Sequence, residues 1–184
     1  MLQRLEATHW LTLAVISALT FLLVTVISRK MTCKDGREVD LGRVGEVRNV
    51  TPDVVMELMK AGFIPVISPV GVDDQGKSLN LNADTVAGKV AEALHAEKLI
   101  LLTDVEGVRD RTGTLLSSLD ARQARELIAQ RVIDGGMIPK VECGLDAIAG
   151  GVRKTHILDG RALHAVLLEI FTDKGMGTEI VPTQ

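Results

Sequence analysis

The spacing of apolar positions predicts alternating helices and strands through most of the chain. Apolar residues that recur every three or four positions indicate amphipathic helices. Short continuous apolar runs are typical of buried strands. Capping residues, first-turn prolines and closing glycines supply the helix ends. On this basis we predict helices at 51–62, 82–94, 120–128, 138–150 and 163–171, and strands at 63–68, 98–103, 155–158 and 177–181.

The order of these elements predicts an α/β fold. Strands that alternate with helices favour a parallel or mixed sheet with helices on both faces. We therefore expect a three-layer αβα sandwich with a mainly parallel sheet, in which the apolar run at 98–103 is a central parallel strand. Before it, Asp35-Gly36 between β-prone runs predicts a hairpin, and residues 73–76 predict a turn.

The N-terminal part of the chain has a different character. Residues 10–28 form a run of 19 positions without a charge, close to the roughly 20 that a bilayer-spanning helix needs. Trp10 and Arg29-Lys30 would mark the two interfaces, and the positive-inside rule would place the following domain in the cytoplasm. The alternatives are a buried helix and a rearranged start of the reading frame. We divide the chain into this segment, residues 1–30, and an α/β domain, residues 31–184.

Composition excludes several classes of function. The net charge is −3, aromatic residues make up 2% and tyrosine is absent, which disfavours a nucleic-acid surface. Cys33 and Cys143 are too far apart in sequence to suggest a disulfide framework. The histidines show no close metal-ligand pairing, although His156 and His164 could meet in space, so we predict no metal site built from protein side chains.

The stretch Gly135-Gly136-Met137-Ile138-Pro139-Lys140 is the most suggestive one for chemistry. Two glycines let a backbone approach a ligand closely, and proline suits the first turn of the helix that follows. The unpaired N–H groups of a helix start favour an anion. Lys140 opposes the helix dipole there, which makes it a poor choice for stability alone. The pattern therefore predicts a phosphate-binding loop, although it is not a Walker loop.

Two further segments carry polar residues next to predicted strands. Asn80, Asn82 and Asp84 alternate at a strand-to-helix junction, where helix capping by Asn82 is the simpler interpretation. The loop that begins at Thr103-Asp104 follows a buried strand, and ligands of α/β folds bind beyond the carboxyl ends of strands. An ordinary surface turn with solvated carboxylates is the alternative for this loop.

In this order and spacing, the segments resemble the acetylglutamate kinases of the amino acid kinase family. The resemblance runs from about Leu41 to the C-terminus, about three quarters of the chain. The matching stretches are GFIPVISPVGVDDQG, LNLNADTVAG, KLILLTDVEGV, DGGMIPKVECGLDAI and HILDGRALHAVLLEIFTDKGMGTEIV. Kinases for aspartate, glutamate, carbamate or uridylate share the fold, but the NLNAD and HILDGR stretches look more like the acetylglutamate branch.

The resemblance implies transfer of the γ-phosphoryl group of ATP to the side-chain carboxylate of N-acetyl-L-glutamate, in arginine biosynthesis in the cytoplasm. It implies that Lys140 stabilises the transferring phosphate, that Asp84 orients catalytic lysines and that Asn80 contacts acetylglutamate. Mg²⁺ would bridge the ATP phosphates. The nucleotide site would comprise Asp104, Val105, Glu106, Gly107, Val108, Arg109, Ile133, Asp134, Gly135, Gly136 and Met137.

The C-terminal block resembles relatives that are inhibited by arginine and that form homo-oligomers. His156, Glu169 and Gly175 match the positions that hold the arginine effector there, and a carboxylate suits a guanidinium. The alternative is a strand histidine with a backbone partner and a solvated helix glutamate.

The resemblance does not extend to the family's N-terminal lobe, which supplies a second catalytic lysine and glycine-rich phosphate loops. The sequence before Leu41 has no such loops, so the predicted fold is truncated. The alternative to an acetylglutamate kinase is therefore a catalytically impaired, membrane-attached module that binds a nucleotide or arginine. A kinase of another branch of the family is a third hypothesis.

Overall fold

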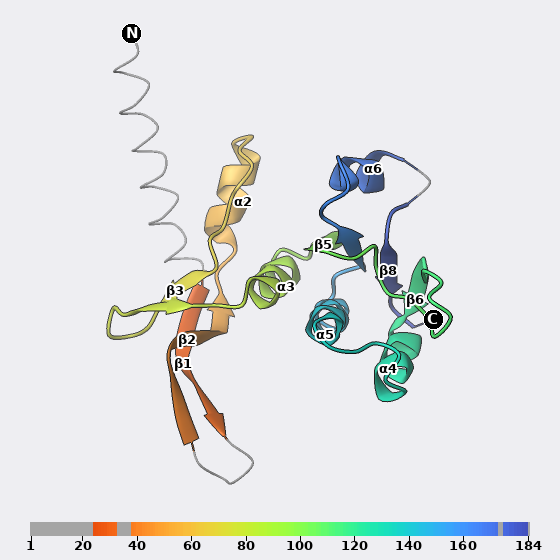
Figure 1. Ribbon diagram of the computed structural model, residues 1–184. Coiled ribbons are helices and arrows are strands. Elements are labelled where there is room, and N and C mark those ends of the chain that lie inside the picture. The colour runs from red at the N-terminus through yellow and green to blue at the C-terminus, as the bar shows by residue number, and fades with distance from the viewer. Residues whose placement is uncertain (1–23, 33–37, 173–174, 184) are drawn as a thin grey trace. The chain divides into compact units, whose positions relative to one another are not determined.

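The computed structural model describes residues 24–32, 38–172 and 175–183 (Figure 1). The chain divides into two compact units, Met1–Leu94 and His95–Gln184. We describe each unit by itself.

Residues 24–32 and 38–94 of the N-terminal unit form a small closed barrel and the two helices described below. Its strands follow the order β1-β2-β4-β3, and a long antiparallel hairpin of β1 and β2 dominates it (Figure 1). The hairpin confirms the prediction from Asp35-Gly36, since Thr32 pairs with Glu38; residues 33–37 themselves lie outside the described residues. The elements are β1 (Val24–Thr32), β2 (Glu38–Val50), α2 (Asp53–Lys60), β3 (Val70–Val72), β4 (Ser78–Asn80) and α3 (Ala83–Ala93).

Local sequence signals position both helices of this unit. Helix α2 begins at Asp53, two residues after the predicted start at Thr51, and Pro52 stands at its N-cap without a side-chain cap. Asn82 caps α3, because its side-chain oxygen accepts hydrogen bonds from the backbone N–H and the hydroxyl of Thr85 (2.9 and 3.1 Å). The buried core joins the barrel to both helices through Val26, Val55, Leu79, Leu81, Val86 and Val90.

The prediction of a buried strand at 63–68 is wrong. None of these residues belongs to a strand, and Ile64 is 91% exposed. An apolar run does not specify a pairing partner, and Pro65 lacks the N–H that a central strand must donate. The strand lies further along, in the β3–β4 hairpin, which the predicted turn at 73–76 closes; there Asp73 accepts backbone hydrogen bonds from Gln75 and Lys77 (both 2.9 Å).

The predicted membrane segment falls mostly outside the described residues. Residues 10–23 are not described, and residues 24–28 belong to strand β1. None of the helices in the described residues combines the length and the hydrophobicity that crossing a bilayer requires. The division of the chain at residue 30 stays a prediction.

The C-terminal unit is a three-layer arrangement around a four-stranded sheet. The sheet has the order β5-β7-β8-β6; β5 pairs with β7 and β6 with β8 in parallel, whereas β7 and β8 are antiparallel. Helices α4 and α5 cover one face and α6 covers the other (Figure 1). The elements are β5 (Lys98–Thr103), β6 (Ser118–Asp120), α4 (Ala121–Ala129), α5 (Met137–Ala149), β7 (Lys154–Asp159), α6 (Ala165–Phe171) and β8 (Thr178–Val181).

This sheet confirms the predicted α/β class with a mixed, mainly parallel sheet, and the predicted elements are found close to their expected bounds. Two details differ. Strand β5 lies at the edge of this sheet and not at its centre, with Leu102 49% exposed. Strand β6 was not predicted, because three residues are too few to show a period.

Close packing holds α5 against β7. Gly144 lies over Thr155, whose hydroxyl donates to the Gly144 carbonyl (3.2 Å). A Cβ at Gly144 would come within 2.9 Å of the Thr155 side chain, so a larger residue would push the helix off the sheet. The helix then turns into β7 through Gly150 and Gly151, as predicted.

We predict that Gly177→Ala destabilises the protein more than Gly113→Ala. Both glycines have positive φ (+71° and +83°), so alanine strains the backbone at both. A Cβ at Gly177 would also collide with the Ile157 carbonyl, whereas nothing lies within 4 Å of one at Gly113. The free energy of unfolding in urea should fall by about 1–3 kcal/mol more in Gly177→Ala. Equal losses of unfolding free energy in the two variants would contradict the close contact of Gly177 with the Ile157 carbonyl of β7.

Candidate functional site

The loops after β5 and β7 leave the sheet of the C-terminal unit at the same end of their strands, which we call the carboxyl edge. Strands β5 and β7 are parallel and in register, with Thr103 opposite Asp159. Their carboxyl ends therefore coincide, and the Gly160 N–H donates to the Thr103 carbonyl (2.8 Å) across the ends. The predicted position of the Thr103-Asp104 loop at the carboxyl end of a strand is confirmed. This edge is where ligands of α/β sheets bind.

The loop after β5 has a fixed base and a polar outer surface. The buried Val108 N–H donates to the hydroxyl of Thr178 (2.8 Å), and Gly107 packs so closely there that a Cβ would lie 2.6 Å from that hydroxyl. Arg109 forms an ion pair with Glu106 (2.6 Å) and donates to the Gly113 carbonyl. Of the predicted nucleotide residues in this loop, Gly107 and Val108 are buried and the exposed ones are Asp104, Val105, Glu106 and Arg109.

The loop after β7 adds a charged pair that the sequence analysis did not single out. Arg161 donates to both carboxylate oxygens of Asp159 (2.9 and 2.8 Å), and its backbone N–H donates to the same group. These hydrogen bonds lower the pKa of Asp159 to about 2, so this carboxylate is ionised throughout the physiological range. The sequence Asp159-Gly160-Arg161, directly after the predicted strand at 155–158, is the feature from which this charged pair could have been predicted.

The predicted phosphate loop reaches the same edge. Helix α5 runs back along the sheet into β7 through a short turn, so helix and strand are antiparallel and the N-terminus of α5 lies at the carboxyl edge. Thirteen helical residues and six strand residues both span about 20 Å, which matches this arrangement.

Within the phosphate loop the glycines are open to a ligand. Gly135 has φ +52°, and no atom lies within 4 Å of a Cβ built on Gly135 or Gly136. The helix begins at Met137, one residue earlier than predicted, and places Lys140 in its first turn. Ile133, two residues before Gly135, is buried, while Asp134 is exposed.

Asn80 and Asp84 belong to the N-terminal unit. Asn80 is an exposed residue of β4, paired with Val70 and Val44 of the neighbouring strands. Asp84 lies in the first turn of α3, half-buried, just after the Asn82 cap. The capping interpretation of Asn82 is confirmed. Asn80 and Asp84 belong to one unit and Lys140 to the other, and each unit is described by itself.

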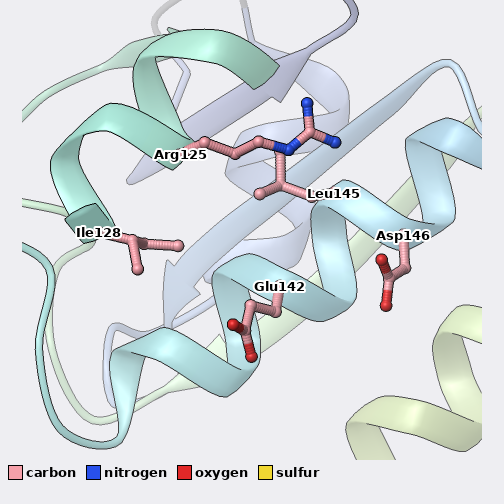
Figure 2. Close-up of a pocket in the computed structure, with 5 residues that line it drawn as sticks. All are labelled: Arg125, Ile128, Glu142, Leu145 and Asp146. Carbon is pink, nitrogen blue, oxygen red and sulfur yellow. The ribbon is translucent and has the colours of Figure 1, made fainter.

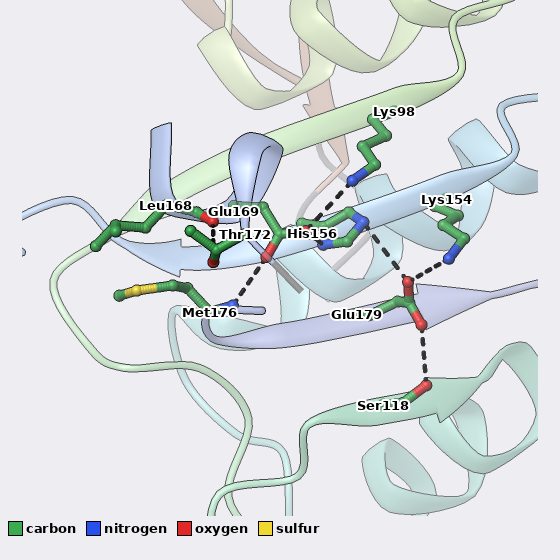
Figure 3. A network of polar contacts seen from close by, with 9 residues as sticks. All are labelled: Lys98, Ser118, Lys154, His156, Leu168, Glu169, Thr172, Met176 and Glu179. Carbon is green, nitrogen blue, oxygen red and sulfur yellow. Dashed lines mark hydrogen bonds and ion pairs between the residues drawn. The ribbon is translucent and has the colours of Figure 1, made fainter. Parts of the chain in front are cut away.

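A buried polar network lies between the sheet and α6 (Figure 3). His156 of β7 and Glu169 of α6 are 3% and 6% exposed, and His156 Nδ1 lies 2.8 Å from Glu169 Oε1. Lys98 extends the network, with its Nζ 3.5 Å from Glu169 Oε1. Glu169 is thus a buried helix residue, not the solvated one of the alternative interpretation.

The protonation of His156 follows from its surroundings. Burial lowers the pKa of His156 below its ordinary value of 6.5, and the charge of Glu169 only partly opposes this. A carboxylate can only accept, so in the neutral ring the proton sits on Nδ1, facing Glu169. Nε2 is then a buried acceptor without a hydrogen-bond donor in the described residues, 3.8 Å from Glu179 Oε2.

Glu179 and Gly175 complete this neighbourhood. Lys154 forms an ion pair with Glu179 (2.7 Å). Burial alone would raise the pKa of Glu179, but the hydrogen bond and the charge of Lys154, together with smaller contributions from His156 and Ser118, lower it overall. Next to Gly175, the Met176 N–H donates to Glu169 Oε2 (2.8 Å), and a Cβ on Gly175 would lie 3.9 Å from that oxygen. The structure therefore brings the three predicted effector residues together.

A separate groove of about 440 Å³ lies between α4 and α5 (Figure 2). None of its residues was predicted as a site residue. It is lined by Arg125 and Ile128 of α4 and by Glu142, Leu145 and Asp146 of α5. Among the described residues, no cluster of three or more His, Cys, Asp or Glu side chains could hold a metal ion.

Residues 8–159 match the sequence model of the amino acid kinase family. The match begins well before Leu41, the position from which the resemblance was inferred. The acetylglutamate kinase of Pelotomaculum thermopropionicum is 57% identical over 157 residues, which cover 83% of this chain and 53% of that protein. That of Pelobacter propionicus is 55% identical over 163 residues, 88% of this chain and 56% of that protein. The chain thus spans about half the length of these relatives.

Solved structures agree with the fold. The N-acetylglutamate synthase from Neisseria gonorrhoeae, complexed with coenzyme A and L-arginine, superposes with a TM-score of 0.75 at 31% identity, over 86% of this chain and 37% of that one. The carbamate kinase from Giardia lamblia bound to AMP-PNP, at 18% identity and a TM-score of 0.59, covers 86% of this chain and 52% of its own and shares the fold alone. The fold and the family match over residues 8–159 show that this chain belongs to the amino acid kinase family.

Proposed function

We propose that the chain is the nucleotide-binding part of an acetylglutamate kinase. In this function ATP phosphorylates the side-chain carboxylate of N-acetyl-L-glutamate, a step of arginine biosynthesis in the cytoplasm. The observation that carries the proposal is the 57% identity over 157 residues to an acetylglutamate kinase. The family match spans Asn80, Asp84 and Lys140, to which we assign the chemistry.

The proposed chemistry needs positioning and charge neutralisation more than proton transfer. A carboxylate is ionised at neutral pH and attacks phosphorus without a general base, so catalysis rests on holding the reactants and stabilising the transferring phosphoryl group. We assign that stabilisation to Lys140 in the first turn of α5. Asp84 would orient the catalytic lysines, and Asn80 would contact acetylglutamate.

The carboxyl edge of β5 and β7 fits a nucleotide. The open glycines and the first-turn N–H groups of α5 suit phosphate oxygens, and the exposed side chains of the loop after β5 suit the rest of the nucleotide. Since no protein cluster of metal ligands exists among the described residues, we expect ATP phosphates to supply most ligands of Mg²⁺.

We further propose an arginine effector site at His156, Glu169 and Gly175. These residues come together in the structure, and Glu169 offers a carboxylate that a guanidinium recognises. The bare His156 Nε2 could accept one more N–H from such a ligand. The synthase from Neisseria gonorrhoeae, which shares the fold, was solved with L-arginine. We also expect the chain to form a homo-oligomer.

The same geometry supports a second function, a catalytically impaired module that binds a nucleotide or arginine. The chain spans about half the length of its relatives, whereas the effector residues and the phosphate loop are all present in the C-terminal unit. Binding could therefore persist without catalysis.

We predict that the chain forms ADP in an acetylglutamate-dependent reaction, and that Lys140→Ala reduces the rate by about 10²–10³-fold, the typical effect of removing one charge-stabilising donor. Lys60→Ala, which removes an exposed lysine of α2, is the control and should leave the rate unchanged. ATP binding without any acetylglutamate-dependent turnover would contradict the kinase proposal and leave the binding module.

We predict that Glu169→Gln weakens arginine binding by about 10- to 100-fold, since it removes a charged hydrogen-bond acceptor. Calorimetry with L-arginine measures this, and binding of the ATP analogue AMP-PNP should not change. Glu126→Gln, on the exposed surface of α4, is the matched control. Undiminished arginine affinity in Glu169→Gln would contradict the effector site.

Burial of His156 leads us to predict that stability depends on pH, whether or not the chain phosphorylates acetylglutamate or binds arginine. The unfolded chain takes up a proton on His156 near pH 6.5, whereas the folded protein resists it to lower pH. The free energy of unfolding should therefore fall as pH drops below about 6.5. His156→Gln, which cannot titrate, should lose part of this slope between pH 7 and 5 in urea titrations. An unchanged slope would contradict a neutral, buried His156.

A further inference from the structure

The proposed function assigns no role to the guanidinium of Arg161, which follows β7. Its Nε and Nη2 donate to the two carboxylate oxygens of Asp159 (2.9 and 2.8 Å). The two partners differ in exposure, since the Asp159 side chain is 13% exposed and that of Arg161 is 66% exposed. The carboxylate therefore holds the guanidinium from the protein side, and the cationic end of the pair faces solvent.

Stability alone is a weak explanation for this pair. An ion pair with an exposed partner contributes little to the free energy of unfolding. The turn after β7 is also held without the guanidinium, because the Arg161 backbone N–H donates to the Asp159 carboxylate (2.9 Å) and the Ala162 N–H donates to the Asp159 carbonyl (3.2 Å). The side chain of Arg161 thus suits a task outside the turn.

The turn that carries Arg161 touches the loop after β5. The Gly160 N–H donates to the Thr103 carbonyl (2.8 Å), and a Cβ on Gly160 would lie only 3.4 Å from that oxygen. The residue before Arg161 is therefore in contact with the end of the strand from which the proposed nucleotide loop leaves. This contact places Arg161 at the carboxyl edge, beside that loop.

The charges around Arg161 leave it able to bind an anion. The hydrogen bond and the charge of Asp159 raise the pKa of Arg161, and the charges of Asp104 and Glu106 make smaller contributions in the same direction. Arg109 of the same loop is already paired with Glu106 (2.6 Å). Among the described residues, the hydrogen bonds of the Arg161 guanidinium all end at Asp159, so Nη1 and the second N–H of Nη2 are open to a ligand.

We propose that Arg161 is a phosphate-binding residue of the nucleotide site and that Asp159 holds it in position. A planar guanidinium can donate to two phosphate oxygens at once, and an anchored one loses less side-chain freedom on binding. Arg161 belongs to the β7 side of the carboxyl edge, whereas Lys140 belongs to the α5 side. The proposal rests on the proposed nucleotide site and adds a second cation to it.

Calorimetry of the full 184-residue chain with AMP-PNP and Mg²⁺ tests the proposal. Arg161→Gln should weaken binding of AMP-PNP by about 10- to 100-fold, the usual effect of losing a charged hydrogen bond. Arg161→Lys keeps the charge but loses the planar fork, so its affinity should be intermediate. The midpoint of urea unfolding should stay the same in both variants, because the pair contributes little to stability.

Arg122→Gln is the matched control and should leave AMP-PNP binding unchanged. Arg122 is 70% exposed and lies two residues after its carboxylate partner, Asp120, as Arg161 does after Asp159. It follows β6, which is parallel to β8, and β8 is antiparallel to β7. The control therefore removes a similar arginine from the opposite edge of the same sheet.

Adenosine distinguishes a phosphate contact from a contact with the base or the ribose. Its binding, followed by saturation-transfer NMR, should be equal in the wild-type chain and in Arg161→Gln. Equal weakening of adenosine and AMP-PNP would overturn the phosphate contact. So would an affinity for AMP-PNP that Arg161→Gln leaves unchanged, although the nucleotide site itself would then stand. A wild-type chain that does not bind AMP-PNP would refute the nucleotide site, and the role of Arg161 with it.

Discussion

The parallel, in-register pairing of β5 with β7 determines where the proposed site can lie. It brings the ends of both strands to one edge and so gathers the loop after β5 and the Asp159–Arg161 pair. Helix α5 returns along the same strands, which brings the Gly135-Gly136 loop and Lys140 to that edge as well. Close contacts of Gly144 and Gly177 with β7 fix this arrangement, because neither position has room for a side chain. The direction of the strands and the close packing of these glycines therefore determine where the proposed phosphate-binding loop lies.

The face of the same sheet that α6 covers carries a buried polar network. There a buried carboxylate, Glu169, is held by His156, by Lys98 and by the Met176 N–H, so its position is determined by three elements at once. Burial of such a group is costly unless its oxygens have partners, and here Oε1 has two and Oε2 has one. A ligand that binds beside Glu169 could bias the contact of α6 with β7, since both ends of the network belong to these elements. Catalysis at one edge and regulation beneath α6 would then share one sheet.

Features that depend on residues close in sequence, such as helix caps, could be predicted from the sequence. Features that depend on strand pairing between distant residues could not. The helix caps at Asn82 and Asp120 were predictable because each side chain bonds an N–H three residues away. The edge position of β5 was not predictable, and neither was the absence of a strand assignment at residues 63–68, because an apolar run does not specify its partner strand. The loops at the carboxyl edge were found from the strand that precedes them. The grouping of His156, Glu169 and Gly175 came from the family resemblance alone, since no local pattern links residues on β7, α6 and the loop before β8.

The central claim is that the carboxyl edge of β5 and β7 binds a nucleotide through the loop after β5 and the start of α5. Amide hydrogen exchange of the full chain, with and without AMP-PNP and Mg²⁺, tests it most directly. Exchange should slow in residues 104–109 and 133–140 and stay unchanged in α4 and in residues 63–68. Protection that is absent from both loops, or that appears beneath α6 instead, would contradict it.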